Sequence, residues 1–249
     1  MASGIAVRLH SCHFNNILML ETPWPMAVRR TVSFCEAVQE GFTTVEGVQA
    51  VRVNGVDEVH RAWRQQNIAV AVDPEWTLIE KLKPDVVIDA ILAKKNLGTS
   101  LQDAPLVIGC GPGFEAGADV HRIVETQRGH DLGRVIETGE AISDTGIPGE
   151  IGGYTVERLL RAERDGVFES EMSIGSRVEK GQIIGHVERE HVTASIPGIL
   201  RGLIRPETPV RCGLKIGDID PRAKRNHCFS VSDKARAIGG GVLECILRE

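Results

Sequence analysis

Aromatic side chains are scarce in this 249-residue chain, which has six Phe, three Trp and one Tyr. The core must therefore be aliphatic, and the aromatic stacking platforms that bind single-stranded nucleic acid are not expected. The net charge is only −5 and no basic block is present, so an electrostatic footprint for DNA or RNA is also missing. No apolar run approaches the roughly 20 residues needed to span a membrane.

Six cysteines are present, but none forms a C-x-x-C pair, which excludes a zinc knuckle and a thioredoxin motif. His10 and His13 flank Cys12, yet Cys12 would point away from the helix face that the two histidines share. No metal site is predicted there. Arg8 and the two histidines interrupt any signal-peptide apolar region. The sequence therefore predicts a soluble, cytoplasmic protein with reduced thiols, without nucleic-acid or membrane partners.

Short apolar runs alternate with helical patterns in the first part of the chain, which predicts a parallel sheet with crossover helices. We expect strands over residues 17–20, 45–53, 68–72, 86–88 and 106–108. Helices are expected over residues 2–10, 25–38, 57–66, 76–82 and 118–125. The fold class is α/β, with a Rossmann-like domain over residues 1–145.

Glycines and short Val/Ile segments replace the helical pattern after residue 139. We expect a glycine-rich linker over 146–161 and a small all-β domain over 162–222, followed by a C-terminal segment, 223–249, that returns to the α/β domain. An internal repeat supports the β domain, because five residue pairs share an offset of 32. The pairs are Gly166 and Gly198, Val178 and Val210, Gly181 and Gly213, Ile184 and Ile216, and Gly185 and Gly217. Two such hairpin units would pack face to face as a pseudo-twofold sandwich.

A glycine-rich loop follows the strand predicted over 106–108 and precedes the helix predicted over 118–125. Its candidate binding residues are Gly109, Cys110, Gly111, Gly113 and Phe114. Glycines allow backbone N–H groups to approach an anion, and a helix N-terminus favours negative charge. A thiol at a helix N-terminus can have a lowered pKa and be reactive, which makes Cys110 a candidate reactive thiol; the alternative is a small residue that is simply tolerated in the loop. Pro112 departs from the dinucleotide fingerprint, and a tight strand-to-helix turn is the alternative.

Polar residues follow other predicted strands and helices. Glu21 ends an early strand, where an acid can bond a ribose hydroxyl. Asp89 and Lys94 follow the 86–88 strand and could handle a phosphate or a proton. Arg128 and His130 follow the 118–125 helix and could contact a phosphate. Each of these residues also fits a solvated loop or an exposed strand end.

Long runs of the sequence carry a family resemblance. They include A-S-G-I-A-V-R-L-H, D-V-V-I-D-A-I-L-A-K-K-N-L-G-T, G-P-G-F-E-A-G-A-D-V-H, T-Q-R-G-H-D-L-G-R-V-I and D-K-A-R-A-I-G-G-G-V-L-E. Together they resemble the YqeB-type family of accessory proteins of selenium-dependent molybdenum hydroxylases. The resemblance covers essentially the whole chain, and it carries over no residue roles.

Two further features follow from the resemblance. Relatives begin with an apolar strand and an R-G-G-G-D-like loop before A-S-G-I-A, so we expect the chain to lack that strand and loop. The repeat region resembles a biotinyl/lipoyl-type barrel-sandwich hybrid, but its turn Glu188-Arg189-Glu190 has no lysine. A swinging cofactor arm is therefore not implied.

The resemblance implies an accessory factor in maturation of, or cofactor insertion into, a selenium-dependent molybdenum hydroxylase. The α/β domain would bind a molybdopterin dinucleotide-type ligand or a precursor, and the β domain would contact the client enzyme. Self-association into a homo-oligomer is compatible with this role. The alternatives are an NAD(P)-dependent oxidoreductase, which Glu21 favours, and a structural adaptor without a ligand.

Overall fold

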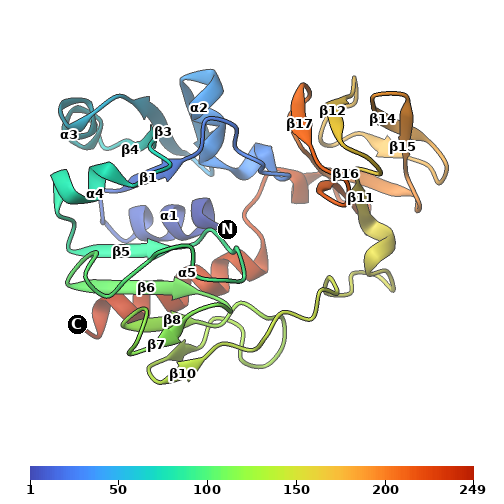
Figure 1. Cartoon of the computed structure of the whole chain (residues 1–249). Coiled ribbons are helices and arrows are strands. Elements are labelled where there is room, and N and C mark those ends of the chain that lie inside the picture. The colour runs from blue at the N-terminus through green and yellow to red at the C-terminus, as the bar shows by residue number, and fades with distance from the viewer. The chain divides into compact units, whose positions relative to one another are not determined.

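The computed structural model describes residues 1–249 and divides them into two compact units. The α/β unit comprises Met1–Pro23, Ala37–Gly146 and Val231–Glu249, and the β unit comprises Trp24–Glu36 and Ile147–Ser230. The architecture is mixed α/β, with parallel and antiparallel sheets (Figure 1). Residues 24–36 and 147–161 therefore lie in the β unit, which differs from the predicted 1–145 domain and 146–161 linker.

The first sheet of the α/β unit has the order β1-β4-β3-β2. Its strands are β1 (Leu18–Glu21), β4 (Ile68–Val72), β3 (Val48–Val53) and β2 (Phe42–Val45). The first three run parallel, and β2 pairs antiparallel with β3. The single strand predicted over 45–53 is thus part of a hairpin, whose two-residue turn has φ 49° at Glu46 and 84° at Gly47. Such left-handed pairs fit the twist of a hairpin.

The second sheet has the order β5-β6-β8-β9. It contains β5 (Val86–Asp89), β6 (Leu106–Cys110), β8 (Arg122–Val124) and β9 (Val135–Ile136), and the first three are parallel. A small ribbon joins β7 (Glu115–Ala116) to β10 (Gly139–Glu140). The helix predicted over 118–125 is wrong, because Gly117 (φ 89°) forms a turn with Val120 and the β-branched residues that follow enter β8.

The helices of this unit are α1 (Ala2–Ser11), α2 (Ala37–Glu40), α3 (Val56–Arg64), α4 (Thr77–Leu82) and α5 (Asp233–Leu247). Helices α1 and α5 pack closely because Gly4 has no side chain: a Cβ there would lie 2.8 Å from the Cβ of Ala235. Ser232 caps α5 by accepting the Ala235 N–H at 3.3 Å. No helix is both long and apolar enough to cross a membrane.

The helix predicted over 25–38 is also wrong, because residues 24–36 form only the short 3-10 helices Arg30–Val32 and Phe34–Glu36. Side chains of this segment bond to the rest of the β unit instead. Arg29 donates to the carbonyl oxygens of His227 at 2.6 Å and Ser230 at 3.0 Å. Tertiary hydrogen bonds therefore override the helical pattern.

Two four-stranded antiparallel sheets build the β unit (Figure 1). Sheet E has the order β11-β18-β16-β13 and sheet F the order β15-β14-β12-β17. Sheet E contains β11 (Leu159–Arg161), β18 (Lys215–Asp220), β16 (Gly198–Leu203) and β13 (Arg177–Val178). Sheet F contains β15 (Glu190–Thr193), β14 (Ile183–Val187), β12 (Gly166–Glu169) and β17 (Thr208–Val210). A 3-10 helix, Val156–Arg158, precedes β11, and another, Arg225–Cys228, follows β18.

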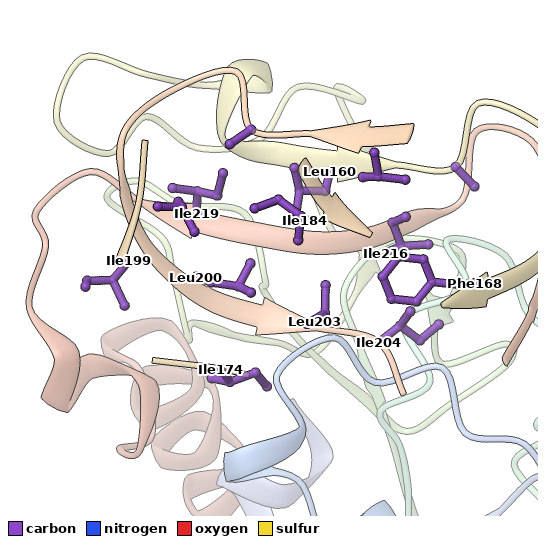
Figure 2. Packing of buried hydrophobic residues seen from close by; sticks show 14 of the residues in the cluster. Leu160, Phe168, Ile174, Ile184, Ile199, Leu200, Leu203, Ile204, Ile216 and Ile219 are labelled. Carbon is purple, nitrogen blue, oxygen red and sulfur yellow. The ribbon is translucent and has the colours of Figure 1, made fainter. Parts of the chain in front are cut away.

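The 32-residue offset of the sequence reappears in the strand pairing. Val178 pairs with Gly198, and its counterpart Val210 pairs with Gly166, so each repeat lends one short strand to the sheet of the other. Between the two sheets lies one aliphatic core with a single large aromatic residue, Phe168, close to Ile204 and Ile216 (Figure 2). The repeat thus forms a two-layer unit whose sheets are interlocked.

Candidate functional site

The predicted site residues of the second sheet lie around the carboxyl ends of β5, β6 and β8. A cavity of about 80 Å³ at this edge is lined by Leu92, Lys94, Pro112, Thr126 and Asp144. Its residues come from the loops after the three parallel strands and from the segment after β10. Carboxyl ends of parallel strands are the usual ligand-binding edge of open α/β sheets.

Charged groups of both signs surround this cavity. The Lys94 ammonium donates to the Asp144 carboxylate at 2.6 Å, and this hydrogen bond lowers the pKa of Asp144. Burial lowers the pKa of Lys234, as does the nearby charge of Arg128, whereas Glu125 and Asp144 oppose that shift. Lys94 thus lines the cavity, and Lys234 lies within electrostatic range of Lys94 and Asp144.

The Asp89 carboxylate forms hydrogen bonds within the loop that follows β5 and does not line the cavity. Its carboxylate is buried and accepts hydrogen bonds from the Thr99 hydroxyl at 2.7 Å and the Ile91 N–H at 3.0 Å. The loop it holds contains two left-handed non-glycine residues, Leu92 (φ 62°) and Lys94 (φ 63°). Such backbone conformations persist only where surrounding contacts enforce them, and they cluster at functional sites.

The glycines of the 109–113 turn are required by close packing. A Cβ at Gly109 would lie 2.6 Å from the Phe114 ring, and one at Gly111 would collide with Thr126 Oγ1. At Gly113 it would lie 2.5 Å from the Lys95 nitrogen. The turn leads into β7, so the helix N-terminus expected to favour an anion is absent. Its glycines instead bring the loops after β5 and β8 close together.

The Cys110 thiol is buried and has a raised pKa, which differs from the lowered pKa expected for a reactive thiol. Its side chain lies in the apolar core beside Leu106 and Ile238 and is 1% exposed. Burial raises the pKa of its thiol to about 12, and the charge of Asp89 adds to that shift. The reactive-thiol prediction is wrong because no helix N-terminus lowers the pKa. Only the backbone of Cys110 remains as a binding group.

Glu125 is a site residue that sequence reasoning missed. This carboxylate is 1% exposed. It accepts the N–H groups of Thr126 and Gln127, both at 2.7 Å, and of Ile142 at 2.8 Å. It thus ties the loop after β8 to the segment that leads to Asp144. A single acid after a strand gives no sequence signal for this role.

The remaining predicted residues are dispersed. Arg128 forms a two-pronged ion pair with Asp233, at 2.8 and 2.9 Å. His130 is exposed. Glu21 ends β1 in the other sheet and lines neither described cavity; burial raises its pKa. The structure therefore assembles Lys94 and the glycine turn, but it does not bring Glu21 or His130 to them.

A second cavity, of about 190 Å³, lies at the carboxyl ends of β3 and β4. Its lining residues are Val53, Asn54, Gly55, Ala71, Val72, Asp73, Thr77, Leu78 and Lys81. Asp73 is buried and accepts the Leu78 N–H at 2.8 Å and the Thr77 hydroxyl at 3.1 Å, which fixes the start of α4. Two sequence features mark this edge, Asn54-Gly55 after one strand and Asp73-Pro74 after the next. Neither was among the predicted binding residues.

Gly98, in the loop that contains Lys94, lies close to Trp76, which precedes the helix lining the larger cavity. A Cβ at Gly98, in the loop after β5, would lie 3.6 Å from the ring of Trp76, which immediately precedes α4. The loop that contains Lys94 is therefore packed against the beginning of the helix that lines the larger cavity.

No protein-family model matches the chain. Over 247 residues it is 46% identical to the uncharacterized protein YqeB of Escherichia coli (strain K12). This match supports membership of the YqeB family. It covers 99% of the chain but 46% of the E. coli protein, so the chain spans about half the length of its curated relative. The YqeB match gives no role, because that protein is itself uncharacterized.

Solved structures give only partial likenesses. An aspartoacylase family protein from Mesorhizobium loti is 19% identical, with a TM-score of 0.24, and covers 27% of this chain and 24% of its own. The ectoine utilization protein EutE (DoeB) from Ruegeria pomeroyi is 20% identical, with a TM-score of 0.24, and covers 34% and 27%. A succinylglutamate desuccinylase/aspartoacylase from Rhodobacter sphaeroides is 18% identical, with a TM-score of 0.25, and covers 34% and 29%. Likenesses this weak carry no argument about function.

Proposed function

We propose that this chain is a cytoplasmic accessory factor in the maturation of a selenium-dependent molybdenum hydroxylase. Its α/β unit would hold a nucleotide-bearing ligand, such as a molybdopterin dinucleotide or a precursor. The family resemblance of the sequence supplies the maturation role. The observation that supports an anionic ligand is the Lys94 ammonium in the lining of the smaller cavity, at the ends of three parallel strands, with Lys234 in electrostatic range of it.

A finer description of the fold belongs to the same proposal. The α/β unit would be Rossmann-like, which its parallel strands and their shared carboxyl edge support. The β unit would be a barrel-sandwich hybrid, which the exchange of β13 and β17 between the repeats supports. In this arrangement the α/β unit binds the ligand and the β unit contacts the client.

The two cavities suit different parts of a nucleotide. At the smaller one, a phosphate would take the place of the Asp144 carboxylate on the Lys94 ammonium, and Lys234 would add a second charge. The larger one offers Asn54, the remaining acceptor capacity of Asp73 and an apolar floor. Those groups match hydroxyls and an uncharged ring system.

The binding proposal is tested by following the melting of the full chain with nucleoside mono- and diphosphates of all four bases. A ligand at 100 times its Kd adds about 2.7 kcal/mol, which corresponds to a rise in Tm of roughly 5–10 °C. Lys94→Ala and Lys234→Ala should each reduce the rise, whereas the exposed Lys180→Ala in the β unit should not. An unchanged Tm with every nucleotide would refute the site.

The maturation role is tested in cells. Deletion of the gene should lower the activity and the selenium content of the molybdenum hydroxylase, and the wild-type gene should restore both. A Lys94→Ala, Lys234→Ala double variant should fail to restore them, while Lys180→Ala should succeed. Full hydroxylase activity in the deletion strain would contradict the role. Oxidation of a reduced nicotinamide cofactor by the purified chain would favour the oxidoreductase instead.

A further inference from the structure

Thr126 has a buried hydroxyl group to which no atom of the chain is hydrogen-bonded. The residue is 6% exposed and lines the smaller cavity together with Lys94 and Asp144. Its N–H donates to Glu125 Oε1 at 2.7 Å, but its side-chain oxygen takes part in no hydrogen bond. Buried polar groups without a partner are rare because they cost free energy. The Thr126 hydroxyl therefore indicates a partner from outside the chain.

A second threonine of the α/β unit shows how the fold pairs a buried hydroxyl. Thr99 is 5% exposed, and its hydroxyl donates to Asp89 Oδ2 at 2.7 Å. This bond holds the loop that contains Lys94. The Thr126 hydroxyl is equally buried but makes no bond of this kind, so a role in holding the fold does not account for it.

The glycine turn leaves room for the Thr126 hydroxyl. A Cβ at Gly111 would collide with Thr126 Oγ1, and Gly111 has a φ of 83°. The Gly111 N–H already donates to the Val124 carbonyl at 2.9 Å. The next residue, Pro112, lines the cavity and has no N–H to offer. At this part of the turn the available donor is thus the threonine hydroxyl and not the backbone.

The charged groups in the cavity lining are Lys94 and Asp144. Lys94 Nζ donates to Asp144 Oδ2 at 2.6 Å, and the two side chains are 57% and 39% exposed. The loop of Lys94 is packed against Gly113, where a Cβ would lie 2.5 Å from the Lys95 nitrogen. Asp144 belongs to a stretch, residues 142–146, that is exposed throughout. The ammonium group is therefore on a loop held by packing, whereas its carboxylate partner is on an exposed one.

We propose that the Thr126 hydroxyl and the Lys94 ammonium bind one phosphoryl group, whose place on Lys94 the Asp144 carboxylate takes in the free chain. The ammonium would neutralise negative charge, and the hydroxyl would donate to a second phosphoryl oxygen. Asp144 would leave Lys94 as the phosphoryl group enters, since an ion pair this exposed is weak. The inference deepens the proposed function: it rests on the nucleotide site of the α/β unit and names a residue that orients the ligand there.

Isothermal titration calorimetry of the full chain with pyrophosphate tests the role of the hydroxyl. Thr126→Val keeps the shape of the side chain and should weaken binding roughly tenfold or more, as expected for a lost hydrogen bond to a charged group. Thr126→Ser should restore most of the affinity. Asp144→Asn should tighten binding about three- to tenfold, because it removes the competing ion pair and the repulsion of the phosphoryl group. Thr44→Val, at an exposed position of β2, should leave the affinity unchanged.

Thermal unfolding without pyrophosphate separates a binding role from a structural one. Thr99→Val breaks the bond to Asp89 and should lower Tm by roughly 3–10 °C. Thr126→Val breaks no bond within the chain, so Tm should stay the same or rise. Equal losses of Tm in the two variants would overturn the proposal, since the Thr126 hydroxyl would then have a structural role.

Three binding results would also overturn it: a pyrophosphate affinity that Thr126→Val leaves unchanged, weaker binding by Asp144→Asn, or tighter binding of malonate than of pyrophosphate. The first would leave Lys94 as the binding group, so the nucleotide site of the proposed function would still stand. The second would mean that Asp144 orients Lys94 for the ligand, and the third would assign the cavity to a carboxylate. Absence of pyrophosphate binding by both the wild type and Asp144→Asn would overturn the anionic site as well.

Discussion

Substitution of Gly113 by alanine tests whether the glycine turn is shaped by packing. Gly113 has a φ of 108°, and an added Cβ would lie 2.5 Å from the nitrogen and 2.6 Å from the Cα of Lys95. Backbone cannot move aside as a side-chain end can. Gly117 is the matched control, since it has a φ of 89° with nothing within 4 Å of an added Cβ.

Both substitutions carry the cost of a left-handed alanine, about 1–2 kcal/mol. Only Gly113→Ala adds overpacking, about 1–3 kcal/mol. With a urea m-value of about 2 kcal/mol/M, Gly113→Ala should unfold at a concentration lower than Gly117→Ala by roughly 0.5–1.5 M.

Urea unfolding of the full chain, followed by tryptophan fluorescence, measures this difference. Trp76 is a suitable reporter because its ring contacts the same loop at Gly98. Equal midpoints for the two variants would refute the reasoning, since the clash would then have no energetic consequence and the turn would be free to relax.

Three further predictions concern buried groups. Because burial raises the pKa of Cys110 to about 12, the exposed Cys12 should be alkylated at neutral pH while Cys110 stays unmodified in mass spectra; comparable labelling of both thiols would contradict its burial. Arg158→Met should destabilise the β unit by about 1.5–3 kcal/mol, because the buried Asp218 carboxylate loses the hydrogen bond at 2.8 Å while Arg201 and Lys215 stay within 4 Å of it; an unchanged stability in calorimetry would contradict this. Since the pKa of Asp220 is lowered to about 2, the stability it contributes is present above about pH 4 and is lost as the pH falls towards 2; Asp220→Asn should flatten that acid limb, and an unchanged limb would exclude the role.

Local patterns predicted five strands of the α/β unit, namely β1, β3, β4, β5 and β6, to within a few residues. The apolar run Ile68–Val72 is strand β4 as expected, because a short run without polar residues suits an inner parallel strand. Repeated glycines were equally informative, since Gly181 (φ 84°) and Gly213 (φ 82°) adopt the same left-handed turn in the two repeats. The apolar run consists of adjacent residues, and each glycine turn depends only on its immediate neighbours, so neither feature requires contacts between distant parts of the chain.

Features that depend on distant contacts were missed. The helical pattern from Pro25 to Val38 gave no sign that Arg29 would bond to carbonyl groups almost 200 residues away. The stretch over 118–125 lost its predicted helix to the turn at Gly117 and to pairing of β8 with β6. The same distinction between local pattern and distant contact applies to the site residues. Lys94 could be named from its place after a strand, whereas the role of Glu125 in tying two loops together and the electrostatic influence of Lys94 on Lys234 arise only in the tertiary fold.

Hydrogen–deuterium exchange of the full chain with a saturating nucleoside diphosphate tests the central claim most directly. Binding at the carboxyl edge of the α/β unit predicts slower exchange in the loop around Lys94, at Thr126 and in the segment that leads to Asp144. The β unit should show no change. Protection confined to the β unit, or none at a nucleotide concentration that raises Tm, would contradict a ligand site at this edge.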